Sequence, residues 1–174
     1  MGKIILFEDK NFQGRSVGCD NDRPDLQAHI SRCNSIQVES GCFMVYERPS
    51  FQGQQHFLKK GEFPDLQRLG LSDSIKSLRA VPQHRGTYRI KIYEKEDLRG
   101  QVIELMEDCP QVMEQLRAHD ILSCSVLEGH WIFYELSNYR GRQFLLKPGE
   151  YKKVSDWSSV IGKVGSLRRA TEHQ

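Results

Sequence analysis

Tyr134-Glu135-Leu136-Ser137-Asn138-Tyr139-Arg140-Gly141 is one of four copies of a short pattern in this chain. Each copy has an aromatic residue, glutamate, three variable residues, an aromatic residue or leucine, one variable residue and glycine. The other three copies run from Phe7 to Gly14, from Tyr46 to Gly53 and from Tyr93 to Gly100. A pattern that recurs along a whole chain decides its architecture, because each copy marks one supersecondary unit.

An alternating strand pattern leads into each copy, most plainly in Arg89-Ile90-Lys91-Ile92-Tyr93-Glu94. This period of two predicts a half-buried antiparallel strand. The glycine that closes each copy then falls where the chain must fold over sharply. Glycine can adopt a positive φ there, and we expect it to leave room for the first aromatic ring of its copy to lie against the turn.

A serine follows each glycine after 21 to 25 residues, at Ser35, Ser77, Ser123 and Ser166. Serine hydroxyls often bond backbone groups in turns, so we expect these four to satisfy backbone groups at the hairpins. A short helical or turn segment precedes the serine, for example in residues 24–30 and 111–116. Each unit is therefore predicted to be mostly β with small helical additions.

The copies are paired, because their glycines are 39, 47 and 41 residues apart. The long interval contains the breaker-rich stretch Pro82-Gln83-His84-Arg85-Gly86. This spacing predicts two domains, 1–82 and 87–174, joined by a linker at 83–86. One unit of about 40 residues cannot bury its apolar face alone, whereas two packed face to face form a β-sandwich. The predicted fold is all-β, with two β-sandwich domains.

Composition excludes several classes of function. The 174 residues carry 25 basic and 23 acidic side chains, which are interspersed and nearly cancel to +2, so neither nucleic acid nor an acidic membrane surface is an expected partner. No apolar run reaches the roughly 20 residues that span a bilayer, and the N-terminus does not read as a signal peptide. The odd number of cysteines without a CxxC pair predicts reduced thiols in a cytoplasmic protein. These cysteines are Cys19, Cys33, Cys42, Cys109 and Cys124.

One catalytic motif occurs, the G-x-S-x-G of Gly14-Arg15-Ser16-Val17-Gly18. A nucleophile elbow needs a strand before it, a helix after it and a large α/β sheet, none of which is predicted here. The six histidines are scattered. The nearest Cys/His grouping, Cys109, His119, Cys124 and His130, lacks the short ligand pairs of structural zinc sites. We therefore expect no enzyme activity, no catalytic residues, no metal site and no cofactor.

The four-copy pattern resembles the βγ-crystallins, whose domains pair two Greek-key motifs marked by an aromatic-Glu hairpin, a glycine and a later serine. The likeness covers nearly the whole chain and is strongest in residues 131–146, which look very like vertebrate γ-crystallins. Residues 31–36 and 164–169 support the same match, and residues 107–110 look closest to γS. The chain is similar to γ-crystallins of γS-like or aquatic γM-like type. The resemblance implies two Greek-key motifs in each domain. It also implies a lens structural protein that contributes refractive index and transparency.

Further expectations follow from this resemblance alone. The protein would be a long-lived monomer in the cytoplasm of lens fibre cells, meeting other crystallins through weak short-range contacts. Its domains would meet through an apolar patch flanked by Gln55 and Gln143. The patch residues are Met44, Phe57 and Val81 in one domain, and Ile132, Leu145 and Ala170 in the other.

The N-terminal half departs from the γ-crystallin pattern. The chain has two tryptophans, Trp131 and Trp157, while Phe43 and Leu69 stand at the corresponding N-terminal positions. The tyrosine that follows Gly-Glu is present at Tyr151 but is replaced by Phe at position 63. The lost hydroxyl removes a possible hydrogen bond of roughly 0.5–1.5 kcal/mol, so the N-terminal domain is predicted to be the less stable one.

Calcium binding outside the lens is the alternative function, since many βγ-crystallin domains bind calcium through segments that begin with paired Asn or Asp. The segments 30–35, 118–123 and 161–166 lack this pair. The segment 72–77 keeps Asp73, with Lys76 where a hydroxyl ligand belongs. Calcium requires six to eight oxygen ligands, so high-affinity binding is not expected. A calcium- or partner-binding module outside the lens stays open as the competing class.

Overall fold

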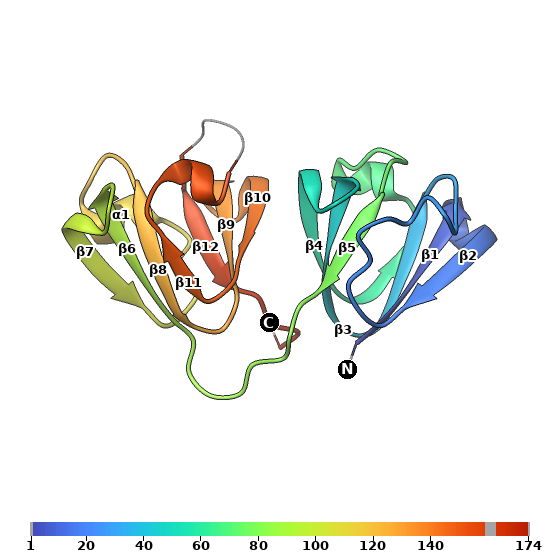
Figure 1. The fold of residues 1–174 in the computed structure, drawn as a ribbon, viewed down its shortest axis with the longest axis horizontal. Helices are drawn as coiled ribbons and strands as arrows, with labels where there is room; N and C mark the ends of the chain where they lie inside the picture. Colours follow the sequence, from blue (N-terminus) through green and yellow to red (C-terminus); the bar gives the residue numbers. More distant parts are fainter. Residues whose placement is uncertain (1, 159–162, 174) are drawn as a thin grey trace. The chain divides into compact units, whose positions relative to one another are not determined.

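The computed structural model describes residues 2–158 and 163–173. These residues form two compact units (Figure 1). Unit 1 contains residues 2–83 and 171–173, and unit 2 contains 84–158 and 163–170. The domain boundaries inferred from the sequence remain a proposal. No helix of the described residues is long and apolar enough to cross a membrane.

Unit 1 is built from antiparallel strands joined by short turns. Its strands are β1 (Lys3–Asp9), β2 (Gln13–Cys19), β3 (Ser35–Arg48), β4 (Gln52–Phe63) and β5 (Ser77–Ala80), and its 3-10 turns are η1 (Lys10–Phe12) and η2 (Leu66–Leu69). The first half of β3 pairs with β1 and its second half pairs with β5. The long strands β3 and β4 therefore pass through both layers of one sandwich.

Unit 2 has the same arrangement, but each of the two long strands of unit 1 corresponds to two shorter strands here. Its strands are β6 (Arg89–Lys95), β7 (Arg99–Leu105), β8 (Ser123–Glu128), β9 (Trp131–Leu136), β10 (Arg140–Leu146), β11 (Gly149–Tyr151) and β12 (Ser166–Arg169), with helix α1 (Val112–Leu116) and 3-10 turn η3 (Val154–Asp156). One sheet has the order β11-β8-β6-β7 and the other β10-β9-β12. The predicted all-β sandwich fold is confirmed in both units.

The two repeats of each unit exchange their third segment. The end of β4 pairs with β3 beside the strands of the first repeat, while Arg23 of the first repeat bridges to Leu78 of the second. In unit 2, β11 joins the sheet of β6 and β8, and Cys109 bridges to Leu167. This crossing gives each repeat the Greek-key connection and makes each sandwich a joint product of two repeats.

Glycine marks the point where the chain passes from one sheet to the other. Gly41 divides the two halves of β3, and Gly129 separates β8 from β9; their φ angles are 72° and 76°. A Cβ on Gly41 would lie 2.7 Å from the Gly2 Cα, and one on Gly129 would lie 2.3 Å from the Tyr88 ring. Only glycine fits both the backbone angle and the space.

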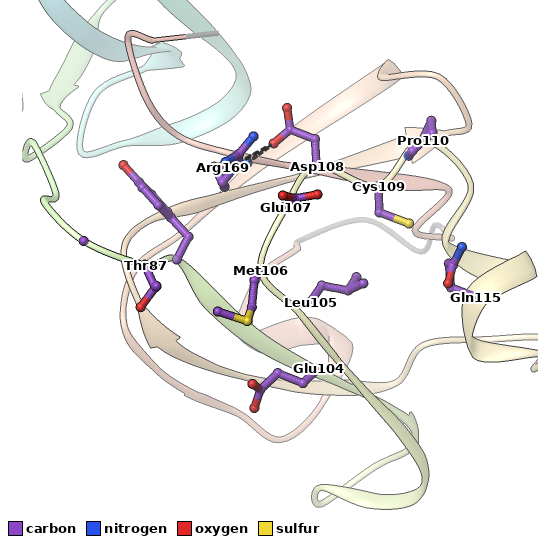
Figure 2. Close-up of a pocket in the computed structure, with 12 residues that line it drawn as sticks. Thr87, Glu104, Leu105, Met106, Glu107, Asp108, Cys109, Pro110, Gln115 and Arg169 are labelled. Atoms are coloured by element: carbon purple, nitrogen blue, oxygen red, sulfur yellow. Dashed lines mark hydrogen bonds and ion pairs between the residues drawn. The ribbon is translucent and has the colours of Figure 1, made fainter.

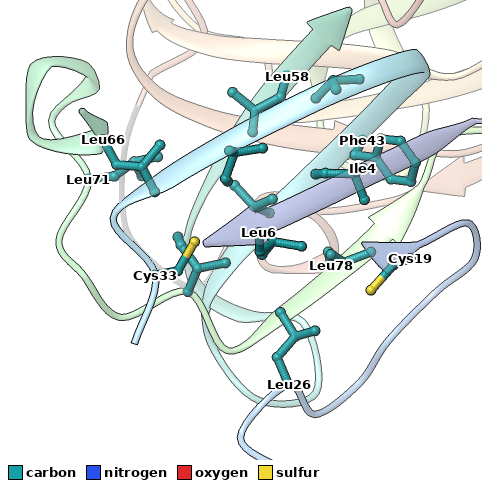
Figure 3. Packing of buried hydrophobic residues seen from close by; sticks show 14 of the residues in the cluster. Ile4, Leu6, Cys19, Leu26, Cys33, Phe43, Leu58, Leu66, Leu71 and Leu78 are labelled. Atoms are coloured by element: carbon teal, nitrogen blue, oxygen red, sulfur yellow. The ribbon is translucent and has the colours of Figure 1, made fainter. Parts of the chain in front are cut away.

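Each unit has its own apolar core. Figure 3 shows the core of unit 1, with Ile4 and Leu6 of β1 among side chains from β3, β4 and β5. Phe43 is fully buried there, and Trp131 is fully buried at the corresponding place in unit 2. The interior positions alternate along β1 and β6, as the sequence pattern predicts.

Candidate functional site

Four serine hydroxyls each fasten one hairpin. The Ser166 hydroxyl donates to the Leu136 carbonyl at 2.6 Å and accepts from the Tyr139 N–H at 2.9 Å. The same pair of bonds, at 2.5–2.6 Å and 2.9–3.0 Å, joins Ser35 to Asp9 and Phe12, Ser77 to Arg48 and Phe51, and Ser123 to Lys95 and Leu98. All four serines have no exposed surface. Each hydroxyl therefore satisfies two backbone groups away from water.

The hairpins contain two consecutive residues in the left-handed region, with φ between 57° and 61°. The pairs are Asn11 with Phe12, Ser50 with Phe51, Asp97 with Leu98, and Asn138 with Tyr139. The first member is small and polar, which suits this region, but the second is bulky and strained there. The serine bond goes to the second member, so it holds the strained residue in place.

The first member of each pair is held by the other repeat of its unit. The Asn11 N–H donates to the Pro64 carbonyl at 2.9 Å, and the Ser50 N–H donates back to the Pro24 carbonyl at 2.8 Å. In unit 2, Asp97 donates to Lys152 and Asn138 donates to Pro110, both at 2.9 Å. Each hairpin is therefore closed by the repeat that it packs with.

The hairpin glycines have a positive φ of 81° or 82°, as predicted. The expectation that they leave room for the first aromatic ring stays a prediction. A Cβ on Gly141 would lie 2.8 Å from the Glu135 carboxylate, and one on Gly100 would lie 2.8 Å from that of Glu94. In these two copies the glutamate next to the aromatic residue lies closest to this space, and Glu135 also accepts from the Arg142 N–H at 3.3 Å.

In the first, second and fourth copies the first aromatic ring packs against the second aromatic residue of the same copy. The ring centroids of Phe7 and Phe12, Tyr46 and Phe51, and Tyr134 and Tyr139 are 5.6–5.7 Å apart in edge-to-face geometry. In the second copy of each unit an arginine covers the second ring, with Arg79 3.8 Å from the Phe51 centroid and Arg168 3.7 Å from that of Tyr139. These contacts add aromatic and cation–π stabilisation to the hairpin.

Ser16 does not lie in a nucleophile elbow. This residue lies in the middle of strand β2, opposite Phe7 of β1, and the strand continues to Cys19. A nucleophile elbow would place the serine at a tight turn between a strand and a helix. Ser16 is therefore a strand residue of the first hairpin.

A pocket of about 680 Å³ lies beside β7 in unit 2 (Figure 2). Its charged lining residues include Glu104, Asp108 and Arg169. Asp108 accepts from the Arg169 side chain and from its backbone N–H, both at 3.0 Å, while Glu104 binds the Arg89 guanidinium at 3.0 Å. Asp108 and Glu104 are therefore held by structural partners within unit 2.

Among residues 2–158 and 163–173, no group of three or more His, Cys, Asp or Glu side chains is arranged to hold a metal ion. Within the segment 30–35, Ser31 donates to the Glu8 carboxylate through its N–H and its hydroxyl, at 3.1 and 3.0 Å. Arg32 places a guanidinium 2.7 Å from the neighbouring Asp9 carboxylate. Part of the segment 161–166 lies outside the described residues.

The family model described as Beta/Gamma crystallin matches residues 3–81 and 89–170. The chain belongs to the βγ-crystallin family. It is 59% identical over 167 residues to Gamma-crystallin 2 of Rana temporaria, covering 95% of this chain and 99% of the relative. It is also 56% identical over 173 residues to human Gamma-crystallin B, covering 99% of both chains. Among solved structures, a beta gamma crystallin from Ciona intestinalis has a TM-score of 0.43 and 34% identity, over 45% of this chain and 99% of that one.

These relatives confirm the predicted resemblance to vertebrate γ-crystallins. γ-Crystallins are structural proteins of the lens, so this chain is a structural protein and not an enzyme. In this βγ-crystallin chain, the repeated serine, glycine and aromatic residues shape the four hairpins and hold them in place, as described above.

The tyrosine corner of the second crystallin unit is formed by Tyr151. Its hydroxyl donates to the Lys147 carbonyl and accepts from the Lys147 N–H, both at 3.0 Å. Phe63 has the same place on β4 of unit 1 and packs against the core there. Phe63 has no hydroxyl, so unit 1 cannot form this pair of bonds.

The residues assigned by resemblance to the domain contact gather on one sheet within each unit. Met44 of β3 lies directly opposite Phe57 of β4, and Ile132 of β9 lies opposite Leu145 of β10. Val81 follows β5 and bonds Cys42, while Ala170 follows β12 and bonds His130, completing each set. A contact between the two sets stays a prediction.

All five cysteines of this crystallin are buried thiols. Burial raises the pKa of the Cys33 thiol to about 12 and that of Cys42 to about 11, and it also raises the pKa of Cys19, Cys109 and Cys124. The reactive thiolate form is therefore scarce at neutral pH.

Proposed function

We propose that this chain is a refractive protein of the eye lens, which stays soluble, monomeric and clear at very high concentration in the cytoplasm of lens fibre cells. The observation that carries this proposal is its identity above 50% to vertebrate γ-crystallins along almost its whole length. The proposed role is physical: a compact chain fills the cell densely and scatters little light.

Stability of the folded state supports this role. Serine hydroxyls with no exposed surface fasten all four hairpins, and hydrogen bonds between the repeats of each unit close them a second time. A hairpin can open only if several buried backbone groups lose their partners together, which is costly. Slow opening suits a protein that must persist without replacement.

Surface charge and thiol burial support the same role. The near-zero net charge of +2 permits close approach without long-range repulsion. Fourteen arginines against eleven lysines, together with the aromatic and sulfur-containing residues, supply polarisable side chains that favour refractive power. Buried thiols of raised pKa limit oxidation and disulfide exchange between crowded copies.

The test is optical. The purified protein would be concentrated stepwise while refractive index, turbidity and scattering mass are recorded. The proposal predicts a linear rise in refractive index, a clear solution, and no stable oligomer after dilution. Turbidity or a persistent oligomer would contradict it. Calorimetry with calcium is the companion measurement, since tight calcium binding would favour a calcium-binding module outside the lens.

A further inference from the structure

The large apolar side chains that are exposed in residues 2–158 and 163–173 all belong to unit 2. They are Val102, Met106, Leu127 and Leu136, with 47%, 46%, 39% and 47% of their surface exposed. Three of them share the β11-β8-β6-β7 sheet. Val102 lies on β7, Met106 directly follows β7, and Leu127 lies on β8.

These three residues lie on the outer face of that sheet. Ile103 and Leu105 of β7 pack against the core, so the alternate residues Val102 and Met106 point outward. Figure 2 shows Leu105 and Met106 pointing in different directions. Leu127 stands at a bulge on β8, where Arg89 pairs with Glu128 and Ile90 pairs with Val126.

The other repeats carry polar residues where the third repeat has Val102 and Met106. Val102 stands two residues after its hairpin glycine, where the other copies have Ser16, Gln55 and Gln143. Met106 stands six residues after it, where the other copies have Asp20, Lys59 and Lys147. Leu127 stands four residues after its serine, where the first copy has Glu39 and the second and fourth copies have Val81 and Ala170. Charged and polar residues at such exposed strand positions oppose association, and the third repeat lacks them.

The charges among these apolar residues balance one another. Arg89 donates to Glu104 at 3.0 Å and lies 3.6 Å from the Glu128 carboxylate, and Lys91 is the cross-strand partner of Glu104. Two positive and two negative groups therefore alternate within the patch. When two such patches meet about a two-fold axis, Lys91 of one copy can face Glu104 of the other.

We propose that this face, named the β7 face and consisting of Val102, Met106 and Leu127 around Arg89, Lys91, Glu104 and Glu128, is where two copies of this chain make contact in concentrated solution. Three strands over about five residues span roughly 200–300 Å² per copy. A stable complex buries about 800 Å² per partner, so the contact is weak and transient. The inference rests on the proposed function, which supplies the crowding that such a contact needs.

The test is a dilution series of the ¹⁵N-labelled full chain followed by NMR. Amide shifts should move with concentration chiefly in residues 89–93, 100–106 and 123–128. The double variant Val102→Ser, Met106→Asp gives the third repeat the residues of the first and should weaken the association about tenfold. Leu127→Glu, which copies Glu39, should act in the same direction from a different strand.

Leu136→Ser is the matched control, since it removes an equally exposed apolar side chain that lies outside the β7 face, and it should leave the association unchanged. Circular dichroism shows whether each variant is folded. Concentration-dependent shifts spread over the whole surface, or folded variants that associate as the original chain does, would overturn the β7 face. A turbid or oligomeric original chain would instead overturn the proposed function, so the two failures are distinguishable.

Discussion

Ser166→Ala should destabilise unit 2 strongly, because one hydroxyl satisfies two buried backbone groups. The substitution leaves the Tyr139 N–H and the Leu136 carbonyl without the partner that they have at 2.9 and 2.6 Å. Each buried group that loses its partner costs about 1–3 kcal/mol, so the expected loss is about 2–6 kcal/mol. For a unit of this size, that corresponds to a fall in the melting temperature of at least about 10 °C.

The chain contains a selective probe for this experiment. Both tryptophans, Trp131 and Trp157, belong to unit 2, so tryptophan fluorescence during urea unfolding reports that unit, whereas circular dichroism reports both. Ser155→Ala is the control in the same unit, since Ser155 is exposed on η3 and should change the stability by less than about 0.5 kcal/mol. A Ser166→Ala loss as small as that of the control would refute the bridging role of the serine.

Three further outcomes are expected. Phe63→Tyr should raise the unfolding free energy of unit 1 by roughly 0.5–1.5 kcal/mol through a tyrosine corner like that of Tyr151, seen by circular dichroism; no gain would contradict this. The N–H and hydroxyl of Ser31 hold the pKa of Glu8 below its ordinary value. The stability that ionised Glu8 contributes to unit 1 is therefore present above the unfolded pKa of about 4.3, and it is lost as pH falls through the folded pKa. Glu8→Gln should therefore reduce the acid sensitivity of unit 1, and an unchanged pH profile would count against it. Native thiol labelling should be very slow at Cys33 and Cys42, whose pKa values burial raises to about 12 and about 11; labelling as fast as in urea would contradict it.

The architecture could be predicted because its signal is repeated four times. Strand alternation, a glycine at a fixed place and a later serine are local features, and they led to paired β-sandwich repeats without any information on distant contacts. The hydrogen bonds of Ser35 and its counterparts could be predicted because the sequence places a hydroxyl near a hairpin whose backbone groups need partners. The separation into pairs followed from one longer interval.

The bonds that close each hairpin from the other repeat could not be predicted. The Asn11 N–H meets the Pro64 carbonyl 53 positions away, and a backbone acceptor gives no sequence signal of its own. The left-handed pairs did leave a trace, since Asn11, Ser50, Asp97 and Asn138 are all small polar residues that tolerate a positive φ. The glutamate carboxylates beside Gly100 and Gly141 could not be predicted either, because the glutamate and the aromatic residue are adjacent in sequence.

The abundance of this chain in different tissues tests most directly whether it is a lens protein. Quantitative mass spectrometry of lens extract and of other tissues from the same animal would measure it. We expect the chain to be among the abundant soluble proteins of the lens and to be scarce elsewhere. A chain absent from the lens but abundant in another tissue would contradict the proposed function, even though every hairpin bond described above would stand.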